Sequence, residues 1–491
     1  MSKRPSNYTH IFKYTGVFGG IQGLNIMVSL VRNKLVAMIL GPQGMGLVSI
    51  FTSTVKLLSD STNLGLPMSA VRKISEAYER GRQAEWLDVV RLVRSWSLLT
   101  AFLGTLLCAL CCVWLNAWAF PKGHYALHFV CLSPLVGLTA LMGGELAILK
   151  GTRHLGQLAR ISVYNVLAAT CVSIPIYWFY GEAGIVPSLV LTGVMQMLLT
   201  IAFSWRRFPY HVSLSPRFLS CGIDIVRLGL AFVLAGVVGS GVDFLIRTYL
   251  NCHASMATVG LFNAGYMMAV TYAGMVFSAL ESDYFPRLSA VCSHHVKLCH
   301  MVNSQTEVCV ILIVPMLVAF IIGMPLLLPL MFSHQFLPVA GMIQVSALSM
   351  FCKALYLPIE YIPLAKGDSR SYFLLELVND VCMLTFVLVG FTLYGLDGAG
   401  WGLFLSSALE AGIAYAYAHF KYGYVMSVSS VGVVAKFLPW LVLAYVLTLT
   451  LQGVAYWVGG ACLVGLASAQ TLRTANEKSD LWNKLKERMR R

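Results

Sequence analysis

Four apolar stretches of the sequence carry polar side chains at helical spacing. In the first, Gln22, Asn25, Ser29 and Arg32 follow one another at steps of three, four and three residues, so they share one face of a helix. A guanidinium at the end of such a stripe can bind an anion, above all a phosphate, through charge-assisted hydrogen bonds. Since ionisable groups within membranes are costly and face a cavity or a partner, we expect this stripe to be functional.

Three further stripes repeat the arrangement with their own cations. They are Ser49, Ser53, Lys56, Asp60 and Asn63; Ser240, Asp243 and Arg247; and Ser346, Ser349, Lys353, Tyr356 and Glu360. We predict that an anionic group binds the cations Arg32, Lys56, Arg247 and Lys353 in a cavity whose polar face holds Gln22, Asn25, Ser53, Asn63 and Tyr356. For Lys56 with Asp60, and for Asp243 with Arg247, the alternative is neutralisation at i, i+4 within one helix. Arg32 has no acidic residue one turn away, so this alternative does not apply to it.

Five acidic residues in or beside such stretches are candidates for ion coupling or gating: Asp60, Asp243, Glu145, Glu360 and Glu410. Glu145 and Glu360 lie five and six residues before the Lys-Gly pairs that begin at Lys150 and Lys366. Neutralisation by these lysines is the alternative for both. Glu410 stands in the middle of its stretch, where burial favours the protonated form. The coupling ion would be H⁺ or Na⁺.

Motifs for catalysis, metal binding or nucleotide binding are weak or absent in the sequence. The segment CSHHVKLCH, from Cys292 to His300, holds metal-binding residue types, but their spacing fits no standard zinc pattern. No Walker sequence, glycine-rich nucleotide fingerprint or G-x-S-x-G elbow occurs. We therefore predict a protein that is not an enzyme, has no cofactor or bound metal and does not use ATP directly.

The elements that must position these residues are membrane helices. Of 491 residues 58% are hydrophobic and 11% charged, and the mean hydropathy is +0.74, which no water-soluble globule of this size accommodates. Apolar runs of about 18 to 25 residues predict an all-α polytopic membrane protein with about fourteen spans. These are 14–31, 47–71, 92–117, 127–149, 161–180, 185–204, 223–246, 258–285, 307–332, 339–365, 372–394, 399–419, 431–450 and 453–472.

Basic residues are distributed unevenly around these spans. The sequence has 35 Lys and Arg against 21 Asp and Glu, and most of the basic residues fall on one side of the membrane if the N-terminus is cytoplasmic. The exceptions are Arg32, Lys34, Lys56, Lys122, Arg247 and Lys353. This positive-inside pattern predicts cytoplasmic N- and C-termini, and it explains the net charge of +14 without nucleic acid as a partner.

The sequence also repeats itself at an offset of 214 residues. Gly46 pairs with Gly260, Leu47 with Leu261, Lys73 with Arg287 and Asn165 with Asn379, and Arg32 falls opposite Arg247 within one residue. Each repeat holds six spans, so we expect two six-helix halves in the same orientation with a cavity between them. The predicted parts are six-helix bundles at 1–210 and 211–425, two lipid-facing helices at 426–472 and a basic cytoplasmic tail at 473–491.

The first two spans resemble a known family. The stretch VRNKLVAMILGPQGMGLVSIF, followed by NLGLPMSAVRKISEA, is similar to the start of bacterial oligosaccharide-lipid flippases, above all the O-antigen and enterobacterial-common-antigen translocases. These belong to the multidrug/oligosaccharidyl-lipid/polysaccharide exporter (MOP) superfamily, and the resemblance implies its MATE-like fold. The family's cavity-facing arginine corresponds to Arg32. Fourteen spans depart from the twelve usual in that branch and are closer to the lipid II flippase.

The resemblance further implies a function in the bacterial cytoplasmic (inner) membrane. A polyprenyl (undecaprenyl) diphosphate-linked oligosaccharide would pass from the cytoplasmic to the periplasmic leaflet by alternating access, for synthesis of a cell-surface polysaccharide. The implied partners are this lipid-linked glycan, the lipid bilayer and other glycan-assembly membrane proteins.

Two other functions stay open. A drug/cation antiporter of the same superfamily would favour acids in its cavity, whereas the first stripe ends in Arg32 and contains none. A membrane-bound glycan polymerase or glycosyltransferase would need a large outer loop or a nucleotide-sugar domain, and the predicted outer loops are short.

Overall fold

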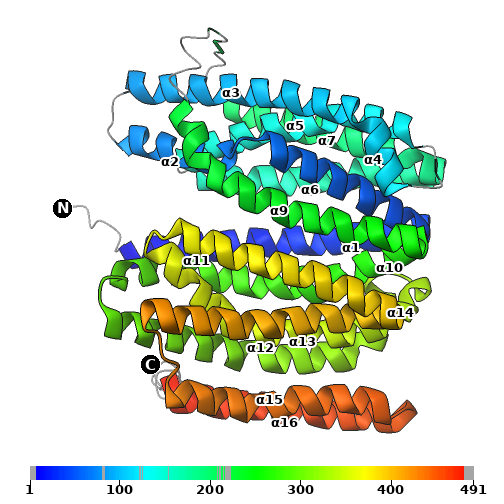
Figure 1. Ribbon diagram of the computed structural model, residues 1–491, viewed down its shortest axis with the longest axis vertical. Helices are drawn as coiled ribbons and strands as arrows, with labels where there is room; N and C mark the ends of the chain where they lie inside the picture. The colour runs from blue at the N-terminus through cyan, green and yellow to red at the C-terminus, as the bar shows by residue number, and fades with distance from the viewer. Residues whose placement is uncertain are drawn as a thin grey trace. The chain divides into compact units, whose positions relative to one another are not determined.

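The computed structural model describes residues 7–79, 83–120, 123, 125–152, 154–206, 208, 212, 213, 215 and 223–479. Within these ranges every regular element is a helix and no strand occurs. The chain divides into two compact units, in each of which the helices run side by side (Figure 1). Unit 1 comprises residues 1–260 with 331–333, and unit 2 comprises residues 261–330 with 334–491.

The helices follow in chain order. Those of unit 1 are α1 (Asn7–Thr62), α2 (Leu66–Glu79), α3 (Gln83–Leu110), α4 (Cys112–Ala119), α5 (Ala126–Gly151), α6 (Leu155–Tyr180), η1 (Gly181–Gly184), α7 (Ile185–Trp205) and α9 (Ile223–His253). α10 (Met256–Tyr266) begins in unit 1 and ends in unit 2. Unit 2 continues with η2 (Met267–Tyr272), α11 (Ala273–Val291), α12 (His295–Met331), η3 (His334–Val339), α13 (Ala340–Ala365), α14 (Ser369–Tyr422), α15 (Val428–Thr450) and α16 (Gly453–Ser479).

Three helical stretches are too long for a single crossing, and each contains a break. α1 has 56 residues, which is about 84 Å of helix, whereas a crossing needs about 20 residues. It breaks at Gly41, where φ is 63°, a conformation that side chains disfavour, and Pro42 follows directly. α14 breaks in the same way at Gly395, where φ is 61°, and η1 separates α6 from α7.

These breaks account for the predicted number of spans. Ten helical stretches are long and apolar enough to cross a membrane. Three of them, which contain the breaks of α1, α6–α7 and α14, supply two predicted spans each. α10, η2 and α11 together cover the predicted span 258–285. All fourteen predicted spans therefore coincide with helices, and the all-α prediction is confirmed.

The first span is longer than predicted. Its helix does not end near Val31 but continues to the break at Gly41, because residues 35–40 are again apolar. Arg32 therefore lies nine residues inside a membrane helix and not at its end.

Unit 1 extends beyond residue 210, which is the predicted end of the first six-helix bundle. α9, which the repeat assigns to the second bundle, packs on α1, α2 and α4. Gly46 and Gly260, which the 214-residue offset pairs, touch one another. A Cβ on Gly46 would collide with the carbonyl oxygen of Met256, and one on Gly260 with that of Pro42. The division into two repeats itself stays a prediction.

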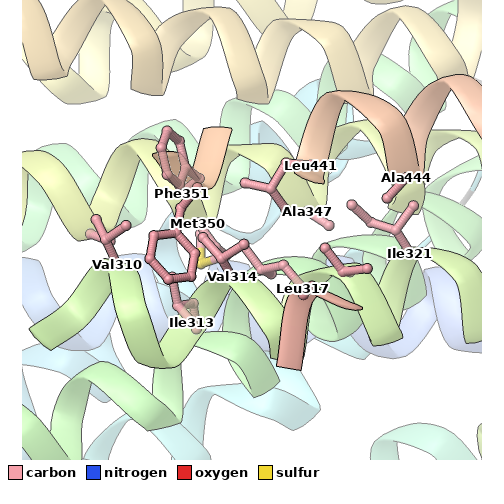
Figure 2. Packing of buried hydrophobic residues seen from close by; sticks show 14 of the residues in the cluster. Val310, Ile313, Val314, Leu317, Ile321, Ala347, Met350, Phe351, Leu441 and Ala444 are labelled. Atoms are coloured by element: carbon pink, nitrogen blue, oxygen red, sulfur yellow. The ribbon is translucent and has the colours of Figure 1, made fainter. Parts of the chain in front are cut away.

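An apolar cluster of unit 2 includes the two C-terminal helices. Figure 2 shows Val314, Leu317 and Ile321 of α12 with Ala347 and Met350 of α13, and Leu441 and Ala444 of α15. The hydroxyl of Tyr456 on α16 donates to the carbonyl oxygen of Ile322 (2.6 Å). This pair therefore packs against the rest of unit 2 on one side, and the prediction that its other side faces lipid stays a prediction. Its inner side is packed by van der Waals contacts, which hold helices together in membranes.

Candidate functional site

Arg32 lies on the side of α1 that packs against α6. Its Nε donates to Oγ of Ser173 (3.3 Å), and two turns earlier Nδ2 of Asn25 donates to Oγ of Ser162 (2.8 Å). The predicted stripe thus lies along polar groups of α6. In the described parts of the chain no carboxylate is within ion-pair distance of Arg32. The hydrogen bond of its guanidinium goes to a neutral hydroxyl.

A second group of charges joins α9 to the part of α1 that follows the break. Oδ2 of Asp243 lies 3.3 Å from Nζ of Lys56, and Oδ1 lies 3.1 Å from Nη1 of Arg247. Arg247 also donates from Nη1 to the carbonyl oxygen of Asp243 (2.7 Å) and from Nε to Oγ of Ser49 (2.8 Å). One carboxylate thus bridges two cations on different helices.

Only one of the two ion pairs that the sequence suggested as alternatives is formed. Asp243 and Arg247 form the expected i, i+4 pair, but Lys56 pairs with Asp243 of α9 and not with Asp60 of its own helix. The side chain of Lys56 is 58% exposed, although it lies about 22 Å along the helix from Gly41. Since hydrocarbon excludes an ammonium, Lys56 faces a wet space.

The other polar residues of this part of α1 make local contacts. Oγ of Ser53 is buried and donates to a carbonyl of its own helix (2.9 Å). Oδ1 of Asn63 accepts from the backbone N–H of Gly65 (2.8 Å) and so fixes the turn after α1. Asp60 lies opposite α9. The side chain of Gln22 lies outside the described residues, and a role for these four residues in binding or coupling stays a prediction.

Glu145 on α5 is enclosed by hydrogen-bond donors. Arg94 of α3 donates from Nε to Oε1 (2.8 Å) and from Nη2 to Oε2 (3.1 Å), and both side chains are buried. Ser204 and Trp205 of α7 donate to the same carboxylate (2.5 and 3.2 Å). The alternative of a neutralised helix-end acid fits this geometry, with an arginine from another helix in place of Lys150. We therefore leave Glu145 out of the proposed coupling site.

The sequence reasoning missed Arg94 as a partner for Glu145. Its signal was a cation two residues inside the span predicted to begin at residue 92. A buried cation is stable only with a counter-charge, and Glu145 on α5 provides it for Arg94.

Unit 2 brings two of the predicted acids together. Glu360 of α13 and Glu410 of α14 are 7% and 5% exposed and lie close enough to act on one another electrostatically. Among described groups, no donor contacts Oε1 of Glu360 or either oxygen of Glu410. Tyr356, one turn before Glu360, faces the same pair. Two buried carboxyls thus lie near one another in unit 2, and their role in coupling stays a prediction.

Two further residues border the carboxyl pair. Glu376 of α14, which the sequence reasoning missed, acts electrostatically on both acids, and its signal was an acid inside the span 372–394. Lys353 lies with its Nζ 5.9 Å from the ring centroid of Phe277. No ion pair of Lys353 occurs among the described residues, so its predicted role in anion binding stays a prediction.

The segment from Cys292 to His300 folds without a metal-like cluster. Nε2 of His295 lies 3.0 Å from the carbonyl oxygen of Gly423 and 3.7 Å from Sγ of Cys299. Over the described ranges, no three His, Cys, Asp or Glu side chains gather as a metal site.

The fold has counterparts among solved membrane transporters. The inward-closed conformation of the lipid II flippase MurJ aligns with a TM-score of 0.67 at 13% identity, over 95% of this chain and 99% of that one. An inward-facing multidrug resistance MATE family transporter of the MOP superfamily gives 0.69 at 12%, over 81% and 94%. A MOP superfamily transporter from Pyrococcus furiosus, described by the reverse polarity of its binding pocket, gives 0.59 at 12%, over 82% and 93%. These likenesses confirm the predicted MOP fold.

Sequence comparison gives the family. No curated protein matches the chain. A family model described as polysaccharide biosynthesis protein matches residues 35–341, a stretch that begins just after Arg32 and includes Lys56, Asp243 and Arg247. Since this match covers more than half of the 491 residues, the chain belongs to the polysaccharide biosynthesis protein family.

Proposed function

We propose that this protein is a flippase that moves a polyprenyl (undecaprenyl) diphosphate-linked oligosaccharide across the bacterial inner membrane. The glycan passes to the periplasmic leaflet by alternating access, both termini are cytoplasmic, and the product serves cell-surface polysaccharide synthesis of the O-antigen type. The observation that carries the proposal is Arg32, a guanidinium inside a membrane helix whose hydrogen-bond partner is a hydroxyl. Such a cation is stabilised when an anion joins it.

The charges of unit 1 suit a lipid diphosphate. Its headgroup is multiply anionic and must be kept away from hydrocarbon, so its carrier needs fixed cations in a wet space. Arg32 offers a planar fork of donors that matches phosphate oxygens, and Lys56 offers an exposed ammonium. The family match and the fold shared with a lipid II flippase support a glycan-lipid as the anion.

We further propose that Glu360 and Glu410 couple transport to H⁺. One proton makes the two carboxylates a singly charged unit inside the membrane, and a second proton makes them neutral. Na⁺ is the second choice, because a hard cation prefers several more oxygen ligands than the two carboxyls supply.

A cation/drug antiporter is the second candidate, and the acidic pair of unit 2 is the observation that favours it. Cationic drugs would bind to carboxylates and would be repelled by Arg32 and Lys56. The two functions therefore differ in their response to the loss of Arg32, which harms an anion carrier and helps a cation carrier. The structural counterparts are transporters, which favours either of these over a glycan polymerase.

Depletion in the native cell tests the proposal. When the protein is depleted, a polyprenyl diphosphate-linked glycan is expected to accumulate in the cytoplasmic leaflet, where a membrane-impermeant lectin or glycosidase cannot reach it in intact cells. The same glycan should become accessible when the wild-type chain is restored. Unchanged glycan accessibility together with increased drug sensitivity would instead establish the antiporter.

A further inference from the structure

The group Lys56, Asp243 and Arg247 allows one step beyond the proposed function, on which this step rests. We propose that Asp243 is a resident counter-ion of the headgroup site. Its carboxylate occupies the place between the two cations that a phosphate group of the substrate takes, and the substrate binds by displacing it.

The carboxylate already imitates a bound phosphate. It uses one oxygen for each cation, Oδ2 for Lys56 and Oδ1 for Arg247. A phosphate group offers the same pair of oxygens and more negative charge. The side chains of Lys56 and Asp243 are 58% and 22% exposed, so an anion can reach the place that they share.

Arg247 is prepared for the exchange. It is held by Oγ of Ser49 and by the backbone carbonyl of Asp243, neither of which depends on the carboxylate. When the side chain of Asp243 swings away, the guanidinium therefore keeps its place and its charge. Lys56, in contrast, has the carboxylate as its described ion-pair partner and is freed.

This arrangement has two consequences for transport. A singly charged anion gains too little from the two cations to displace the carboxylate, whereas a diphosphate brings enough charge to do so, which makes Asp243 a specificity-determining residue. After translocation the carboxylate competes for its former place and promotes release. Arg32 has no such competitor, so the two cationic places differ in how tightly they hold an anion.

Binding of inorganic pyrophosphate to the full chain in lipid nanodiscs tests the proposal by titration calorimetry. Asp243→Asn is expected to bind pyrophosphate about tenfold more tightly than the wild type, because it removes one negative charge a few ångströms from the anion. It should also bind monophosphate, which the wild type excludes. Asp397→Asn, which removes the same charge at the break of α14, is the matched control and is expected to leave the affinity unchanged.

A gain of affinity separates this role from a structural one, since damage to the fold weakens binding. If Asp243→Asn does not accumulate in the membrane, Asp243→Ser must show the same gain, because it too removes the carboxylate. If Arg32→Ala weakens pyrophosphate binding but both Asp243 variants bind it no more tightly than the wild type, the counter-ion role of Asp243 is wrong and the headgroup site stands. Pyrophosphate binding that is absent, or that Arg32→Ala does not change, overturns the proposed headgroup site as well.

Discussion

Unit 1 and unit 2 hold their membrane-embedded charges in opposite ways. In unit 1 Arg32 contacts a hydroxyl, and Arg247 and Lys56 share the carboxylate of Asp243. In unit 2 the carboxyls of Glu360 and Glu410 are buried near one another. A guanidinium stays charged at any pH that a cell reaches, whereas a carboxyl pair changes its charge by one when it gains or loses a proton.

The difference fits the two tasks that we propose, headgroup binding in unit 1 and coupling in unit 2. Fixed cations attract an anion whatever the state of the transporter, so they suit substrate binding. A pair with a removable proton can bias one conformation over another, because only an interaction that differs between states shifts their populations. The proposed binding site thus lies in unit 1 and the proposed coupling site in unit 2, and the variants below test this division.

Replacement of Arg32 by Ala has the largest expected effect. Export of the lipid-linked glycan should fall by about a hundredfold or more, since loss of one partner of a buried charge contact costs about 2–5 kcal/mol. Arg32→Lys should keep part of the activity, because charge is retained while the bidentate fork is lost. Surface glycan measured in cells, with membrane insertion checked in parallel, gives the result.

Lys34→Ala is the matched control for this prediction. It removes the same charge two residues away on a different face of α1 and is expected to leave export nearly unchanged. Normal surface glycan in Arg32→Ala would contradict the assignment of binding to unit 1.

Replacement of Glu410 by Gln tests the coupling function of unit 2. The amide is permanently neutral, so export should lose its dependence on the proton gradient and fall by about tenfold, a usual size for coupling between sites. Pyrophosphate affinity should stay as in the wild type, since unit 1 is unaltered. A variant that still follows the gradient, in reconstituted vesicles with an imposed pH difference, would break the division between the units.

The fold was largely predictable because membrane helices are read from long apolar runs. All fourteen predicted spans coincide with helices, and the repeat glycines Gly46 and Gly260 fall at a close contact between helices. The length of the first helix was wrong, since Arg32 and Lys34 interrupt a run that continues to Leu40. Hydropathy alone cannot tell a charge at a span end from one inside the span.

The candidate site was predictable within helices but not between them. Helical spacing placed Asp243 and Arg247 in one pair, because i, i+4 neighbours are fixed by the helix itself. The contact of Lys56 with α9 and the proximity of Glu360 to Glu410 depend on how helices pack, which no periodicity shows. For the same reason, the sequence did not show that Arg94 pairs with Glu145.

The buried pair of Arg94 and Glu145 is expected to stabilise unit 1 without serving transport directly. Glu145→Gln leaves the guanidinium buried without its counter-charge, which costs about 3–5 kcal/mol and should lower the thermal stability of the detergent-solubilised protein strongly. The exposed i, i+4 pair of Arg72 and Glu76 is the control, and Glu76→Gln should have little effect. Loss of export with unchanged thermal stability in Glu145→Gln would return Glu145 to the coupling site.

The smallest expected effect on thermal stability concerns an exposed ion pair of unit 2, that of Asp368 and Lys421. Asp368, between α13 and α14, lies 2.7 Å from Nζ of Lys421 and accepts from the backbone N–H of Ser371 at the start of α14 (3.2 Å). The hydrogen bonds from Lys421 and Ser371 lower the pKa of Asp368 below its usual range. A carboxyl with a lowered pKa in the folded state stabilises the fold in full above its unfolded pKa of about 3.9, and this contribution is lost as the pH falls through the folded value.

Asp368→Asn should therefore lower the midpoint of thermal unfolding slightly and by the same amount from pH 7 down to about 4. Below about pH 4 the difference from the wild type should shrink, because the unfolded wild-type chain then gains a proton that the folded one resists. Lys421→Met should follow the same pH profile, since it removes the other partner of the pair. If the difference already shrinks between pH 7 and 5, the effect comes from a group with a higher pKa than Asp368. Asp368 would then not be the exposed counterpart of the buried ion pair in unit 1.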